Sequence, residues 1–190
     1  MTRKLLFFIF IFILISSITV ISISKPTKSN EDKNITWVHL FHISRSINKN
    51  IVIYEVGISS PTEPGEKPKF IINNPIKVYW RLYAKQGEIQ ELTAIEEKLG
   101  YGINISTSNS DQVVFYVKPL PKKLIRVEFV KENGSYIPKP ITNINNEDCY
   151  ITEIFIQAKK SFPLPKVIFI DIKGVSIKTN QIVTEHIVNK

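Results

Sequence analysis

Cysteine is almost missing from this chain, since Cys149 is the only one in 190 residues. A single cysteine excludes an internal disulfide, and no Cys/His spacing in the chain is typical of a zinc site. Cys149 begins an apolar alternation that runs to Ile156, so we interpret it as a buried thiol that behaves as a small apolar residue. The alternative is a nucleophile, but no histidine lies near it in the sequence.

Motifs of catalysis are also missing. The chain has no Gly-x-Ser-x-Gly, no His-Glu-x-x-His and no glycine-rich phosphate loop. Its three histidines are His39, His42 and His186. Residues three apart on a strand point to opposite faces, so His39 and His42 are not expected to share a metal. We therefore predict no catalytic residue, no cofactor and no metal.

The charge balance is basic, with 25 Lys and Arg against 17 Asp and Glu. A basic surface favours anionic partners, and for an exported protein we expect lipid head groups or acidic polysaccharides rather than nucleic acid. The tightest clusters, Lys122-Lys123 and Lys159-Lys160, are predicted to be solvated charges at loops or strand ends.

The first 24 residues have the order of a secretory signal: Arg3-Lys4, an apolar run from residue 5, and small residues before a cleavage position after Ser24. The alternative is an uncleaved anchor, because residues 5–23 approach the roughly 20 residues that cross a bilayer. In either case the chain is predicted to be exported, as a secreted, periplasmic or outward-facing tethered protein. If the segment is not cleaved, membrane contact is expected only through residues 5–23. The polar stretch 25–34 is predicted to be a flexible spacer.

From residue 35 to residue 190 the chain is predicted to be one β-rich domain. Short runs of Ile, Val, Tyr, Phe and Thr are broken by Pro, Gly and Asn. They predict strands at residues 37–44, 51–56, 75–83, 112–118, 124–131, 135–141, 150–158, 166–174 and 181–188. About eight to nine such strands favour a single antiparallel β-barrel, with a two-sheet β-sandwich as the alternative.

Two hairpins and one helix are predicted inside this domain. The polar link at residues 46–50 indicates a hairpin, and Asn133-Gly134 is the strongest hairpin signal in the chain. Residues 91–99 carry Leu, Ile and Leu at the i, i+3 and i+7 positions of one helical face, so this segment is predicted to be a short helix packed on the sheet.

Four blocks of the chain, in order, resemble one family. Residues 41–54 resemble its opening motif, residues 74–80 its proline-containing strand that ends in an aromatic pair, residues 91–103 its Lys-x-x-Tyr-Gly-Ile block, and residues 162–167 the start of its late strand. The chain thus resembles the domain-of-unknown-function family numbered 4833 over roughly residues 40–188. The resemblance implies an exported or cell-surface domain and supplies no reaction.

The candidate ligand-binding residues are polar and aromatic residues of these blocks: Arg45, Asn48, Asn50, Tyr79, Lys98 and Tyr101. In one interpretation the helix end and the first hairpin meet at a barrel mouth, where Arg45 and Lys98 bind an anionic group flanked by the two tyrosines. In the other, Arg45 pairs with a carboxylate, the asparagines make the turn and Lys98 caps the helix.

Three functions are consistent with the sequence. The first is a non-catalytic, exported or surface-tethered binding module for an anionic or carbohydrate ligand. The second is a small hydrolase or isomerase acting on an envelope or extracellular glycan, with Glu96 or Glu97 and Arg45 as its reacting groups. The third is a structural component of a surface complex with a protein partner. The lack of catalytic motifs favours the first.

Three Asn-x-Ser/Thr sequences begin at Asn34, Asn104 and Asn133. They predict N-glycosylation only in a eukaryotic secretory pathway.

Overall fold

The computed structural model describes residues 35–61, 65–162 and 165–188. The predicted signal or anchor at residues 1–24 and the predicted spacer at residues 25–34 lie outside these ranges. Within them, no helix combines the length and the hydropathy that a bilayer crossing requires.

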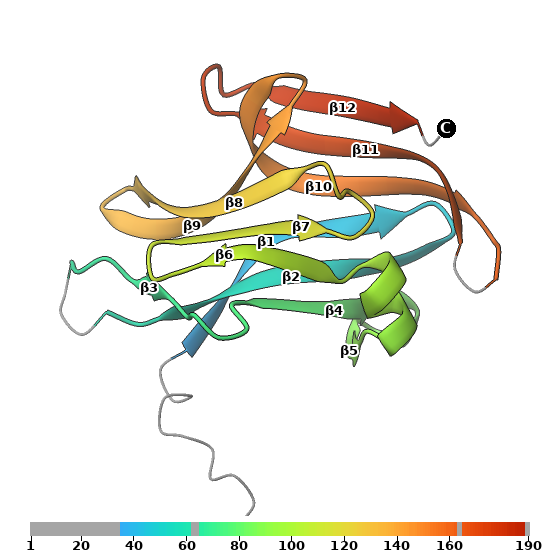
Figure 1. Ribbon diagram of the computed structural model, residues 1–190, viewed down its shortest axis with the longest axis horizontal. Coiled ribbons are helices and arrows are strands. Elements are labelled where there is room, and N and C mark those ends of the chain that lie inside the picture. The colour runs from blue at the N-terminus through green and yellow to red at the C-terminus, as the bar shows by residue number, and fades with distance from the viewer. Residues whose placement is uncertain (1–34, 62–64, 163–164, 189–190) are drawn as a thin grey trace, which may run out of the picture. The chain divides into compact units, whose positions relative to one another are not determined.

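The described part of the chain forms one sheet of twelve strands with two short helical segments (Figure 1). The strands are β1 (Ile35–Arg45), β2 (Asn48–Ser59), β3 (Lys69–Phe70), β4 (Ile76–Leu82), β5 (Glu88–Glu91), β6 (Ile103–Ser108), β7 (Gln112–Val117), β8 (Leu124–Glu132), β9 (Ser135–Ile144), β10 (Glu147–Lys159), β11 (Lys166–Ser176) and β12 (Ile182–Val188). The helical segments are the 3₁₀ turn η2 (Tyr83–Lys85) and the π-helix η3 (Glu96–Gly100).

Nine strands follow one continuous path in the order β5-β4-β2-β1-β10-β9-β8-β7-β6. Strands β11 and β12 extend from the other edge of β10, and β3 pairs with β2. All neighbours are antiparallel except β1 and β10, which run parallel. The sheet curls into a half-barrel, so the prediction of one mostly β, antiparallel, barrel-like domain with a short helix is confirmed. The parallel pair of β1 and β10 was not expected.

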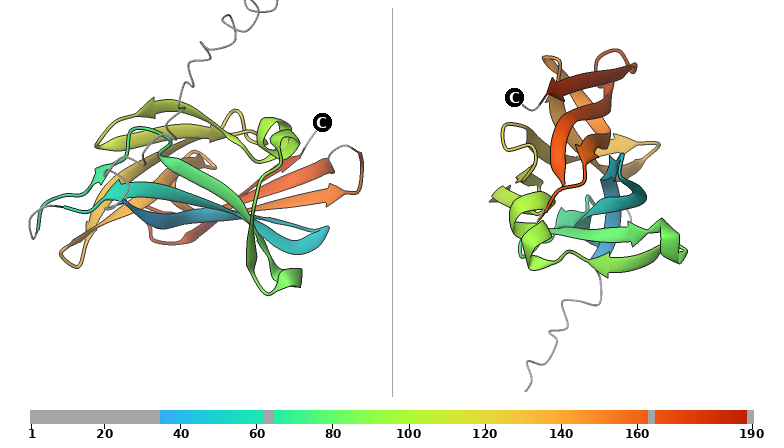
Figure 2. Two further views of the ribbon diagram at one scale, coloured as in Figure 1. Left: turned by 90° about the horizontal axis from the view of Figure 1, so that it is seen from below. Right: turned by 90° about the vertical axis from the view of Figure 1, so that its right-hand side faces the viewer.

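Strand β10 is where the sheet divides. Its residues 147–150 pair with β9 and its residues 153–156 pair with β1, while β11 runs along its other edge. A bulge between Ile151 and Glu153 separates the two halves, and bulges bend strands. Figure 2 shows the consequence, since the orange and red strands turn away from the blue and green ones.

The core lies between the two arms of the divided sheet. Phe41 of β1 stacks on Tyr54 of β2 with ring centroids 4.7 Å apart. Phe115 of β7, on the opposite arm, has its ring centroid 6.4 Å from that of Phe41. All three are fully buried. Strand β4 buries Trp80 and Leu82 and turns its charged residues outward, as its alternation predicts. Cys149 is also fully buried, which confirms its interpretation as a core residue.

The predicted strands and both hairpins are found, including the Asn133-Gly134 turn, in which both residues have positive φ. Strands β3, β5 and β6 are not predicted, because β3 has only two residues and the other two have mostly exposed side chains with few apolar residues. The predicted helix is shorter, because residue 91 still belongs to β5. Its packing was also wrong, since Ile95 and Leu99 are 51% and 60% exposed.

A glycine just after η3 makes this segment possible. A Cβ on Gly102 would lie 2.0 Å from the backbone oxygen of Glu97, whereas a Cβ on Gly100 would meet nothing within 4 Å. The chain therefore returns under the helical turn at a distance that only glycine permits.

We predict that Gly102→Ala destabilises the protein by about 3 kcal/mol, the upper end of overpacking costs, because the clash is with rigid backbone. Gly100→Ala should leave the free energy of unfolding within about 0.5 kcal/mol of wild type. Urea unfolding followed by tryptophan fluorescence measures both. Equal midpoints for the two variants would contradict the close approach of Gly102.

Candidate functional site

A pocket of about 570 Å³ opens inside the curl of the sheet. One wall consists of inward side chains from β10, β11 and β12, and the other of the end of η3 and the connection between β7 and β8. Its volume lies in the range of small-molecule sites, roughly 300–1,000 Å³. Most of its lining is apolar and includes Leu99, Leu120, Ile156, Ala158, Ile170 and Ile187.

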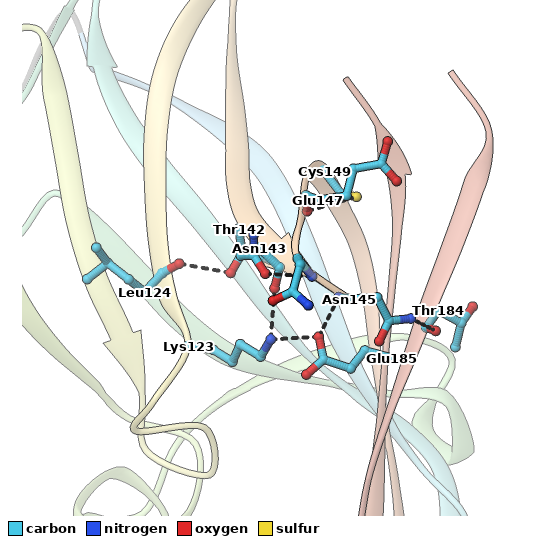
Figure 3. Close-up of polar contacts among 10 residues, drawn as sticks. Lys123, Leu124, Thr142, Asn143, Asn145, Glu147, Cys149, Thr184 and Glu185 are labelled. Atoms are coloured by element: carbon cyan, nitrogen blue, oxygen red, sulfur yellow. Dashed lines mark hydrogen bonds and ion pairs between the residues drawn. The ribbon is translucent and has the colours of Figure 1, made fainter. Parts of the chain in front are cut away.

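The polar part of the pocket wall is an ion pair between Lys123 and Glu185 (Figure 3). Lys123 Nζ lies 2.6 Å from Glu185 Oε2 and also donates to the backbone oxygen of Asn143 at 2.8 Å. Both side chains are only 19% exposed. The prediction that Lys123 is a solvated charge is therefore wrong, because its partner lies on β12, 62 residues away.

Tyr101 lines the pocket and is held from three sides. Its backbone oxygen accepts from the Tyr54 hydroxyl at 2.6 Å, and its hydroxyl accepts from Arg45 Nη1 at 2.9 Å. The Tyr101 and Trp80 rings are nearly perpendicular, with centroids 5.0 Å apart. Burial raises the pKa of Tyr101 more than the Arg45 charge lowers it, so the hydroxyl is protonated at neutral pH.

Three of the six predicted site residues come together here. Arg45 bridges Tyr101 and Asn48, whose Oδ1 accepts from Arg45 Nη2 at 3.2 Å, and its guanidinium lies over the Trp80 ring at 4.2 Å. Arg45 Nε is buried without a hydrogen-bond partner, and no carboxylate among the described residues pairs with Arg45. Asn50 adjoins this group, since its backbone N–H donates to Asn48 Oδ1.

The other two predicted residues lie elsewhere. Tyr79 is on the outer face of β4, where burial and a hydrogen bond with Glu55 raise its pKa. Lys98 is exposed on η3 and makes no hydrogen bond or ion pair with any described residue. The end of η3 is capped by its own backbone, through a bond from the N–H of Tyr101 to the oxygen of Glu96. The structure thus does not bring Arg45, Lys98 and the two tyrosines around one anion.

Comparison with known protein families gives one match over this same part of the chain. The family model described as Domain of unknown function (DUF4833) matches residues 41–186, more than half of the chain. The chain belongs to this family. No curated protein and no solved structure matches it significantly.

Glu96 has a structural partner in this DUF4833 domain. Its carboxylate accepts from the backbone N–H and the hydroxyl of Thr93, both at 2.9 Å, and the Thr93 hydroxyl accepts from the Glu96 N–H at 3.3 Å. This reciprocal pair is a capping box, whose Thr-x-x-Glu pattern was readable in the sequence. Glu97 is exposed on the same turn.

The histidine prediction is wrong in one respect. His39 pairs with Glu55 and Phe41 pairs with Tyr54, so Leu40 is an extra residue in β1. This bulge returns His42 to the face of His39, with ring centroids 6.3 Å apart. Burial and the neighbouring His42 lower the pKa of His39. Alternation predicts opposite faces only for a regular strand.

Each histidine of the DUF4833 domain stands opposite a carboxylate on a neighbouring strand. His39 is the register partner of Glu55, His42 of Glu153 and His186 of Asp171. The last two pairs approach to 3.8 Å and 2.6 Å. Within the described ranges, no group of three or more His, Cys, Asp or Glu side chains is arranged to hold a metal ion.

The three glycosylation sequences are placed differently. Asn34 lies outside the described residues. Asn104 is exposed on β6, where its Oδ1 accepts from Lys118 at 2.6 Å. Asn133 is exposed in the β8–β9 turn with a φ of 48°.

We predict that Tyr54→Phe destabilises the protein by about 1–3 kcal/mol, because the backbone oxygen of Tyr101 would be left buried without its donor. Tyr83→Phe is the matched control, since Tyr83 is 54% exposed. This substitution should lower the free energy of unfolding by less than about 0.5 kcal/mol. Chemical unfolding curves compare the two. A neutral Tyr54→Phe would refute this account of how Tyr101 is anchored.

Proposed function

We propose that this DUF4833 domain is a non-catalytic binding module that holds a small molecule with an apolar body in the half-barrel pocket. The observation that carries the proposal is the pocket itself: about 570 Å³, mostly apolar walls, and a few fixed polar groups. This combination is the usual composition of small-molecule binding sites.

The apolar lining of the pocket restricts the classes of ligand that the sequence suggests. A free anion or a wholly polar saccharide would lose hydration against Ile156, Ile170 and Ile187, which offer no hydrogen bonds in exchange. An apolar body would instead gain roughly 25 cal/mol for each Å² removed from water. A charged end would stay hydrated at the rim, where Lys122 is exposed.

The contacts of the candidate acid–base residues favour binding over hydrolysis. The Glu96 carboxylate is occupied by Thr93, and the Arg45 guanidinium by Tyr101 and Asn48. Neither residue is directed at the other, as a cooperating pair would require.

The test uses the full chain and N-phenyl-1-naphthylamine, a neutral fluorophore that brightens in apolar surroundings. We expect saturable binding to wild type and at least a tenfold loss of affinity in Ala158→Phe, because a phenyl group would take up space that the probe needs in the pocket. Ala84→Phe is the matched control, since Ala84 is exposed on η2 and does not line the pocket. All three proteins keep residues 1–24, so any probe bound there contributes equally.

Circular dichroism must show that Ala158→Phe is folded, and Ile187→Phe, on β12 of the same pocket wall, provides a second variant if it is not. Absence of saturable binding to wild type would refute the proposal. Undiminished binding by folded pocket-filling variants would refute it as well.

We also propose that the domain acts outside the cytoplasm. The support is the order of basic start, apolar run and small residues in the first 24 residues. We expect N-terminal sequencing of the protein from its own host to give a start at Lys25 in the extracellular or envelope fraction. A chain with an intact N-terminus found in the cytosol would contradict this.

A further inference from the structure

This inference rests on the proposed binding function and concerns the polar wall of the same pocket. The Lys123 ammonium has three N–H groups, of which one contacts Glu185 and one contacts the Asn143 oxygen. The third has no acceptor among the described residues. Glu185 accepts from Lys123 and from the backbone N–H of Asn145 through Oε2 alone.

The second oxygen of Glu185, Oε1, therefore has no hydrogen-bond donor in the described part of the chain. Among the described residues, Arg45 Nε is the single fully buried side-chain nitrogen or oxygen that lacks a partner. Glu185 Oε1 also lacks a partner, so it is not fully buried and a ligand can reach it. The pair thus leaves one donor and one acceptor for a molecule in the pocket that both residues line.

The pair is held in place from both sides (Figure 3). Asn145 and Asn146 have φ values of 51° and 65° and form the β9–β10 turn, which points the Asn145 N–H at Glu185. The Asn145 side chain donates to the Thr184 oxygen at 2.9 Å, so the turn is fastened to β12. Polar groups fixed in this way need little reorganisation when a ligand arrives.

The net charge of the pair decides which polar group fits. A carboxylate that accepts from Lys123 would lie beside the Glu185 carboxylate, and an ammonium that donates to Glu185 would lie beside Lys123. A hydroxyl or a primary amide can accept from the first and donate to the second without either repulsion. We infer that the ligand of this pocket is an uncharged amphiphile whose hydroxyl or amide group docks on the Lys123–Glu185 pair.

The experiment compares decan-1-ol, decanoate and decylammonium as competitors of the bound fluorophore at pH 7.5. They share one alkyl length and differ in the charge of the end group. For wild type we expect decan-1-ol to bind at least tenfold more tightly than either ion. Stronger binding of decanoate that Lys122→Met abolishes would place the end group at the rim and overturn the inference.

Two variants then move the preference in opposite directions. Glu185→Gln keeps an oxygen for Lys123 and Asn145 but leaves a pair with a net positive charge. The affinity for decanoate relative to that for decylammonium should therefore rise at least fivefold. Lys123→Met leaves Glu185 negative, and decylammonium should gain instead. A residue that serves only stability would not produce opposite shifts.

The two proposals fail separately. If the fluorophore does not bind wild type, or binds folded Ala158→Phe and Ile187→Phe equally well, the binding function fails. If pocket binding holds but decan-1-ol shows no advantage, or Glu185→Gln leaves the preference unchanged, only the assignment of the end group fails.

Discussion

Strand β10 has one edge that two other strands share, and the shape of the domain depends on this sharing. Residues 147–150 bond to β9 and residues 153–156 bond to β1, so the arms that contain these strands must diverge. The bulge between Ile151 and Glu153 supplies the bend. Gly174 stands opposite Ile151, where an added Cβ would lie 2.7 Å from the Ile144 side chain. The bend can be this tight because no side chain intervenes.

The pocket follows from that divergence, since one of its walls includes the inner face of β10 beyond the bend, at Ile156 and Ala158. Two fixed groups then complete it. Tyr101 is anchored to the β1–β2–β4 arm by Tyr54, Trp80 and Arg45, and β12 is fastened to the β8–β9–β10 arm by Glu185. An open sheet would leave these apolar side chains to water, whereas the half-barrel holds them around a space that a small molecule can fill.

The outer face of the same strands has a different character. Three histidines oppose three carboxylates across strands β1, β2, β10, β11 and β12, although the chain as a whole is basic. Opposite charges directly across a sheet stabilise the pairing when the histidine is protonated. The polar outer face and the apolar inner face together explain why the alternation of these strands was readable in the sequence.

Local features were predictable because they depend on residues close in the sequence. The alternation of β4, the Asn133-Gly134 turn and the burial of Cys149 need only the pleat of a strand and the backbone freedom of Asn and Gly. The contact of the first hairpin with the end of the helix was also anticipated, through Arg45 and Tyr101. Tyr79 was misplaced because both faces of β4 carry aromatic residues, and sequence alternation does not say which face meets the helix.

Only the tertiary structure decided the features that depend on partners far apart in the chain. Leu40 reads as an ordinary strand residue, and it becomes a bulge because its neighbours pair with Glu55 and Tyr54. Lys123 reads as a surface charge, and it becomes part of a pocket wall because β12 brings Glu185 to it. The sequence by itself determined the β class, the hairpins and the apolar faces, since these follow from local sterics and hydrophobic periodicity. The branching at β10, and with it the pocket, depends on pairings across more than a hundred residues, which no local pattern encodes.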